Sequence, residues 1–260
     1  MSGASPRTSW KECIRHFTWA WHTVIMGTGA TSTLVHAFPY GNGSPAIKVV
    51  TLIVFFLNII LFVLFTGVTI ARYTMFPGVW LKMIRHPVQS LFIGAFPMGA
   101  MTLINTALVA NQEWNFGNVG FLCALWGFWW LVSIVSYLIA FGMLYAMMAE
   151  QKHAVEETTT LWLLPFITLI VASTTGGLLS TALKAQSTKF AILTASFSLT
   201  MAIIGLSLAF MITTIYFARL VIYGPPEKPH VLSAFVILGP LGQGGYSLLI
   251  NGQNLSEILP

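Results

Sequence analysis

Seven long apolar stretches dominate this chain of 260 residues and limit the folds open to it. Each is longer than the roughly 20 apolar residues that cross a hydrocarbon core of about 30 Å. Hydrophobic residues make up 56% of the chain and charged residues only 7%, a balance typical of integral membrane proteins. The sequence therefore predicts one all-α membrane domain over residues 1–260, with seven transmembrane helices paired into hairpins at 17–38, 47–71, 88–110, 120–148, 160–183, 190–220 and 231–251.

Helix-breaking residues recur in alternate spans. The third, fifth and seventh spans contain proline and the first contains closely spaced glycines, whereas the intervening spans contain no proline. Proline or glycine inside a spanning helix frees backbone groups that lipid cannot satisfy, so such helices usually face protein or a water-filled cavity. We therefore expect the odd spans to be broken midway and to line a central pore, with the even spans outside.

The distribution of carboxylates indicates what such a pore would carry. The chain has no aspartate, and all seven glutamates lie outside the predicted spans. Carriers of cations or protons usually hold them with intramembrane carboxylates, whereas hydroxyls, amides and the N-termini of opened helices suit anions. We predict an anion pathway lined by Gly27, Thr28, Gly29, Pro97, Gly99, Asn105, Thr174, Thr175, Gly176, Gly239, Gly242 and Gln243.

The same residues have a packing interpretation. Small residues let helices approach closely, and hydroxyls can bond back to their own helical turn. The recurrence in four alternate spans favours the pathway for the set as a whole.

Three ionisable residues could bear on entry or pH sensing. His22 lies more than a turn inside the first span, where protonation would link anion affinity to pH; the alternative is a neutral imidazole bonded to a neighbouring carbonyl. Arg85 and His86 precede Pro87 at the start of the third span. At a cytoplasmic mouth they would either gather anions by their local field or anchor the helix at the interface.

The positions of the charged residues predict the topology, and the spacing of particular residue types argues against other classes of protein. Nine of the twelve lysines and arginines fall on the same side of the membrane as the N-terminus. Because basic residues gather on the cytoplasmic side, this predicts a cytoplasmic N-terminus. The first span is expected to be retained and not cleaved as a leader. The basic residues lack the pattern of a nucleic-acid module. The histidines and the two cysteines have no metal-ligand spacing, so we expect no metal, no cofactor and no enzymatic reaction.

Five strings resemble the tellurite-resistance/dicarboxylate transporter family over residues 13–252. They are Arg15–Thr18, Met26–Gly29, Ile84–Phe92, Phe96–Gly99 and Leu238–Gly245. This family includes fungal sulfite efflux pumps, yeast malate transporters and plant guard-cell slow anion channels.

The resemblance implies ten helices in five hairpins, with the odd helices around the pore and one pore in each subunit of a trimer. It also implies export of sulfite or bisulfite across the plasma membrane. A malate transporter on the same fold is the alternative, although a dicarboxylate should favour an arginine deep in the pore and no predicted span has one. Helices eight to ten of the family lie outside this chain, so a truncated assembly subunit without transport activity is a further alternative.

Overall fold

The computed structural model describes residues 10–40, 44–114, 117–225 and 228–258, and these residues contain helices and no strands. Arg7, one of the basic residues used to predict the topology, and Glu227, one of the seven glutamates, lie outside the described residues. Three long helices, α3 (Pro45–Met75), α6 (Val119–Ala149) and α8 (Thr188–Tyr223), alternate along the chain with four shorter ones, α2 (His22–His36), α5 (Ala95–Trp114), α7 (Leu164–Leu183) and α9 (Leu238–Ile258). Two short helices that the sequence analysis did not predict are α1 (Trp10–His16) and α4 (Gly78–Ile84).

Six of the seven predicted spans correspond to helices that are long and apolar enough to cross a membrane. The exception among the described residues is the first, where α2 has 15 residues. At 1.5 Å per residue, α2 is about 22 Å long, less than the hydrocarbon thickness of about 30 Å. A short 3-10 segment, η1 (Trp19–Trp21), precedes α2 and lengthens it at its N-terminus.

The predicted mid-span breaks are wrong. Each of α2, α5, α7 and α9 is a continuous α-helix, and each follows directly on a 3-10 segment: η1, η2 (Ser90–Gly94), η4 (Thr160–Leu163) and η5 (Lys228–Ile237). Pro97, Pro165 and Pro240 lie in the first turn of their α-helices. A proline there costs no hydrogen bond, because the first N–H groups of a helix have no partner within it. The prolines therefore mark where a 3-10 entry becomes an α-helix.

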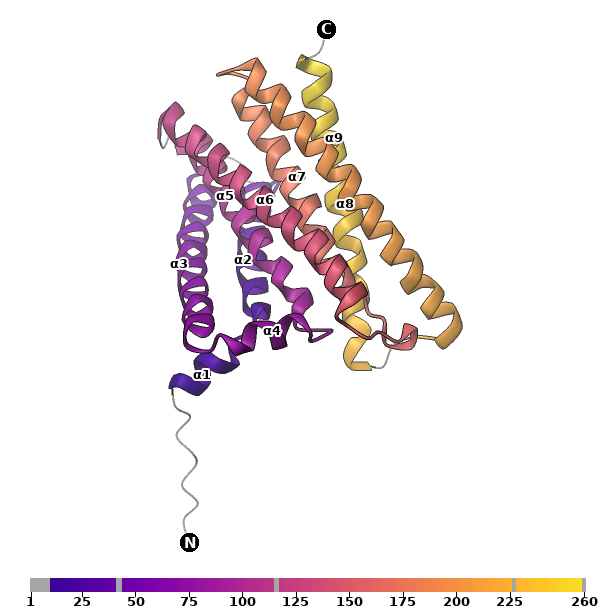
Figure 1. The fold of residues 1–260 in the computed structure, drawn as a ribbon. Helices are drawn as coiled ribbons and strands as arrows, with labels where there is room; N and C mark the ends of the chain where they lie inside the picture. The colour runs from indigo at the N-terminus through magenta and orange to yellow at the C-terminus, as the bar shows by residue number, and fades with distance from the viewer. Residues whose placement is uncertain (1–9, 41–43, 115–116, 226–227, 259–260) are drawn as a thin grey trace.

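The four shorter helices form a row in which α2 contacts α5, α5 contacts α7 and α7 contacts α9. The long helices α6 and α8 run obliquely across this row, and α3 lies at its edge (Figure 1). Most residues of α7 are buried, whereas only Thr51, Asn58, Thr69 and Arg72 are buried in α3. Thus α7 lies inside the bundle and α3 at its outside, whereas α9 is mostly exposed, because only one of its sides packs against α7 and α8.

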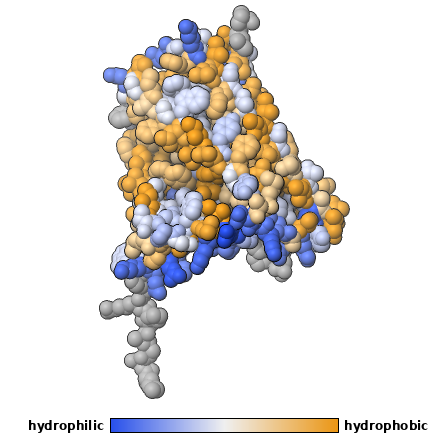
Figure 2. Space-filling view, viewed as in Figure 1, coloured by the Kyte–Doolittle hydropathy of each residue, from blue (hydrophilic) through white to orange (hydrophobic). Residues whose placement is uncertain are grey.

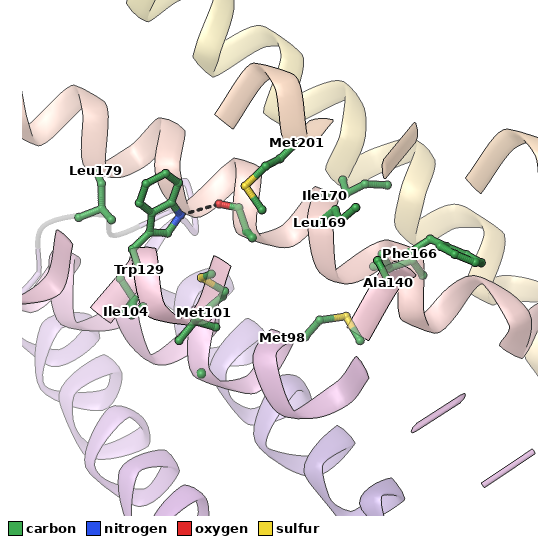
Figure 3. Close-up of a cluster of buried hydrophobic side chains, with 14 of the residues drawn as sticks. Met98, Met101, Ile104, Trp129, Ala140, Phe166, Leu169, Ile170, Leu179 and Met201 are labelled. Carbon is green, nitrogen blue, oxygen red and sulfur yellow. Dashed lines mark hydrogen bonds between the residues drawn. The ribbon is translucent and has the colours of Figure 1, made fainter. Parts of the chain in front are cut away.

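The centre of the core is the contact between α6 and α7. The indole of Trp129 is fully buried, and its Nε1 donates to the carbonyl of Ala172 at 2.8 Å (Figure 3). Phe166 and Met201 are also fully buried and extend the same cluster. This aromatic and aliphatic packing fixes α7 against the long helices.

Charged groups lie at the two ends of the helix bundle. Arg85 pairs with Glu150 at 3.1 Å at one end, and Lys48 with Glu113 and Lys184 with Glu257 form pairs at the other. The surface between the two ends is largely hydrophobic (Figure 2). This banded surface is the one expected of a helical bundle that crosses a bilayer.

Candidate functional site

The exposed faces of α2 and α9 carry small residues among larger apolar ones. The long helices expose large apolar side chains such as Ile60, Leu138 and Phe217. Besides apolar side chains such as Leu34 and Leu249, α2 exposes Gly27 and Thr31, and α9 exposes its glycines at 239, 242, 245 and 252. A Cβ atom added at Gly27 or Gly242 would meet no other atom within 4 Å. These faces therefore combine small residues with open space.

Three of the predicted pathway glycines instead fill tight helix contacts. A Cβ at Gly29 would lie 2.2 Å from Thr102 Oγ1, and one at Gly99 would lie 3.1 Å from Ile25 Cγ2, so these glycines bring α2 and α5 together. A Cβ at Gly176 would lie 2.5 Å from a ring carbon of Trp129. The packing interpretation accounts for all three.

Two threonine hydroxyls of α7 that were predicted to line the pathway bond back to their own helix. Thr175 Oγ1 donates to the carbonyl of Val171 at 3.1 Å, and Thr174 Oγ1 donates to that of Ile170 at 3.1 Å. Thr174 Oγ1 also lies 3.4 Å from the backbone carbonyl of Gln243 on α9. The hydroxyl groups of these two threonines therefore already have hydrogen-bond acceptors within the helix bundle.

A polar seam between α7 and α9 escaped the sequence analysis. Ser173 Oγ and Ser247 Oγ lie 2.6 Å apart, and Asn251 Nδ2 donates to the carbonyl of Ser247 at 2.9 Å. Asn254 Nδ2 donates to the carbonyl of Gly177 at 2.7 Å. Ser247, Asn251 and Asn254 are spaced four and then three residues apart, so they share one face of α9. This period is the signal that could have found them.

The remaining predicted pathway residues lie at varied depths. Thr28 is half-buried, and its Oγ1 donates to the carbonyl of Val24 at 2.8 Å. Asn105 is half-buried, and its Oδ1 has no hydrogen-bond partner among the described residues. Pro97 is buried in the first turn of α5, whereas Gly239 is exposed at the start of α9. The structure therefore does not gather all twelve predicted residues into one site.

His22 is fully buried at the start of α2. Rings of Phe17, Trp19, Phe65 and Phe96 surround it, with centroids 5.3–6.5 Å away. Among the described residues, neither ring nitrogen has a hydrogen-bond partner. The imidazole therefore occupies aromatic surroundings away from the open faces of α2 and α9.

Arg85 and His86 directly follow α4 and are exposed. Besides the Arg85 pair with Glu150, His86 Nδ1 accepts from the backbone N–H groups of Val88 and Gln89, both at 3.2 Å. A residue that the sequence analysis missed, Gln151, holds the same loop by donating to the carbonyl of Ile84 at 2.6 Å and to Ser90 Oγ at 3.0 Å. The loop before α5 is thus held by directed hydrogen bonds.

These observations define a class: a multi-pass helical membrane protein in which the buried polar groups of the described residues are mainly hydroxyls and amides, with one imidazole, His22, and one guanidinium, Arg72. Within the described ranges, no three His, Cys, Asp or Glu side chains come together in a group that could hold a metal ion. Apart from Arg72, whose Nε donates to the carbonyl of Arg15, the interior therefore offers neutral hydrogen-bonding groups.

Comparison with known proteins gives the family. A family model described as voltage-dependent anion channel, SLAC1, matches residues 16–260, and the chain belongs to this family. The sulfite efflux pump SSU1 of Arthroderma benhamiae is 33% identical over 99% of this chain and 67% of its own length. SSU1 of Candida albicans is 28% identical over 96% of this chain and 50% of its own. The malic acid transport protein of Schizosaccharomyces pombe is 21% identical over 94% and 54%.

Proposed function

We propose that this chain is a membrane transporter that exports sulfite or bisulfite from the cytoplasm. The observation that carries the proposal is its similarity to sulfite efflux pumps over almost its whole length. The neutral polar interior supports the same proposal, because an anion path needs several weak donors and few fixed charges. A negative membrane potential inside would favour anion exit without covalent chemistry, so the protein is not an enzyme.

The arrangement in the membrane is part of the proposal. It places one seven-span domain in the plasma membrane with a cytoplasmic N-terminus, and a pore between the small-residue faces of α2 and α9. The proposal is supported by the row of shorter helices, in which α2 and α9 are the two end members. A homotrimer is the expected assembly, with no nucleic-acid partner.

Malate is the second candidate substrate. The similarity to a malic acid transport protein favours it. A dicarboxylate should bind a guanidinium, because arginine forms paired hydrogen bonds with carboxylates. The buried Arg72, however, lies at the end of α3, where its Nε donates to the carbonyl of Arg15 at 3.1 Å. This placement favours the smaller inorganic anion.

Removing a donor from the proposed path should slow transport without unfolding the protein. We expect Thr28→Ala and Gln243→Ala to lower sulfite flux roughly tenfold each, since a hydrogen bond to a charged group contributes about 1.5 kcal/mol. Flux into liposomes, normalised to folded protein, measures this. Thr200→Ala is the matched control, because Thr200 makes the same backbone bond, to Ser196, on an exposed position of α8. Normal flux in both variants would remove these residues from the path.

The charge of Arg85 should raise the anion concentration at the mouth. We expect Arg85→Gln to lower flux by up to about tenfold at an ionic strength near 0.01 M, with the difference fading near 0.5 M as salt screens the field. Arg85→Lys should keep the flux. Glu150→Gln should raise it, because Glu150 offsets the charge of Arg85. A loss with Arg85→Gln that does not change with salt would contradict the field account and indicate an anchoring role.

A further inference from the structure

An apolar groove opens between α3, α5 and α6 on the side of the bundle. Its volume is about 420 Å³, and every residue that lines it is apolar. Small side chains of α5, Ala100 and Ala107, form the floor. Phe55 and Phe62 of α3 form one wall, and residues of α6 from Phe121 to Val135 form the other.

The length of the groove matches one leaflet of a bilayer. Its floor runs from Phe96 to Ala107 on α5, which is about 16 Å at 1.5 Å per residue. Half of a hydrocarbon core of about 30 Å is about 15 Å. The groove therefore has the length that an acyl chain occupies in one leaflet.

A polar pocket adjoins the groove at the end of the bundle that carries the C-terminus. Phe55 lines both, and the pocket is otherwise bounded by residues that include His36, Lys48, Glu113 and Trp114. Lys48 pairs with Glu113, and His36 Nε2 lies 3.9 Å from the same carboxylate. All three side chains are about one quarter exposed, at 24% to 29%. Charges of both signs thus lie next to the end of the apolar groove.

We propose that this groove and pocket bind one zwitterionic phospholipid. An acyl chain lies along Ala100 and Ala107. The phosphate accepts from Lys48, whose ammonium has three donors and can keep its bond to Glu113. The headgroup ammonium lies near the Glu113 carboxylate, and Trp114 packs at the interface, as tryptophan commonly does. This charge complementarity selects a zwitterionic headgroup over an anionic one, and the site is independent of the transported anion.

Native mass spectrometry of the purified chain with added phosphatidylethanolamine tests the proposal. We expect one retained lipid per chain, and a retained fraction at least fivefold lower in both Lys48→Gln and Ala107→Phe. The first variant removes the phosphate donor and the second fills the groove. Lys189→Gln and Ala124→Phe are the matched controls, because both residues are exposed and neither lines the groove or the pocket. The controls should retain the lipid.

Several outcomes would overturn this site. Equal retention by all variants, or equal loss in the controls, would indicate annular lipid without a site. Preference for phosphatidylglycerol would contradict the charge argument. Loss of chain dimers or trimers in Ala107→Phe, in place of lipid, would identify the groove as an interface between copies. If Ala107→Phe does not fold, Lys48→Gln decides the question, since this partly exposed residue at a helix end can change without disturbing the core.

Discussion

Replacing Trp129 by alanine should lower the free energy of unfolding by about 3 to 5 kcal/mol, the range for large buried aromatic side chains. The ring is fully buried between α6, α7 and α8, and its Nε1 bonds to the Ala172 carbonyl. Truncation leaves a cavity and removes the indole hydrogen bond to a carbonyl that keeps only its helical partner. In a bilayer these contacts matter because helices there associate through packing and hydrogen bonds.

Denaturant unfolding in detergent micelles measures this loss. Trp129→Phe should show an intermediate loss, because it removes the donor and part of the ring but keeps most of the side-chain volume. Leu138→Ala, at a position of α6 that is 69% exposed, should change little. A loss under about 1 kcal/mol for Trp129→Ala would mean that the α6 and α7 contact is not the centre of the core.

Gly176→Ala should destabilise the protein by about 1 to 3 kcal/mol, the cost of overpacking a filled core. The added methyl would lie 2.0 Å from Ser198 Oγ and 2.5 Å from the indole of Trp129. The serine hydroxyl can rotate away, but the buried ring cannot. Gly142→Ala is the control on α6, where no atom lies within 4 Å of the new Cβ. There the higher helix propensity of alanine should stabilise the protein by about 0.5 to 1 kcal/mol.

The opposite signs of these two glycine substitutions make the test decisive, because both add the same methyl group to a helix. In the double variant Trp129→Ala with Gly176→Ala, the loss of unfolding free energy should be smaller than the sum of the losses in the two single variants. The reason is that the methyl group enters the cavity that the indole leaves. Additive losses would show that Gly176 and Trp129 do not share one contact.

Much of the helix arrangement could be predicted from sequence, because spanning length and hydrophobicity are local properties. The span predicted at 120–148 corresponds to α6 (Val119–Ala149), and the one at 160–183 to η4 and α7. The prediction for the first span is weaker, since α2 is short and rich in glycine and threonine. Breaks at Pro97 and Pro240 were predicted wrongly, because sequence does not reveal where a helix changes from 3-10 to α geometry.

The candidate site was harder to predict than the helices. A glycine such as Gly27 and one such as Gly176 look alike in sequence, and only the neighbouring helix decides that the first faces open space while the second meets Trp129. The seam of Ser173, Ser247 and Asn251 depends on contacts between residues more than 70 positions apart. Such pairings follow from helix packing, which periodicity within one helix does not determine.

Anion flux through the purified chain tests the central claim most directly. The protein is reconstituted into liposomes at a fixed voltage, and uptake or current is recorded with sulfite, malate, nitrate and chloride in turn. Sulfite export predicts flux that is largest for sulfite and that falls in Thr28→Ala and Gln243→Ala but not in Thr200→Ala. Flux that is largest for malate, or no sulfite flux from folded protein, would contradict it.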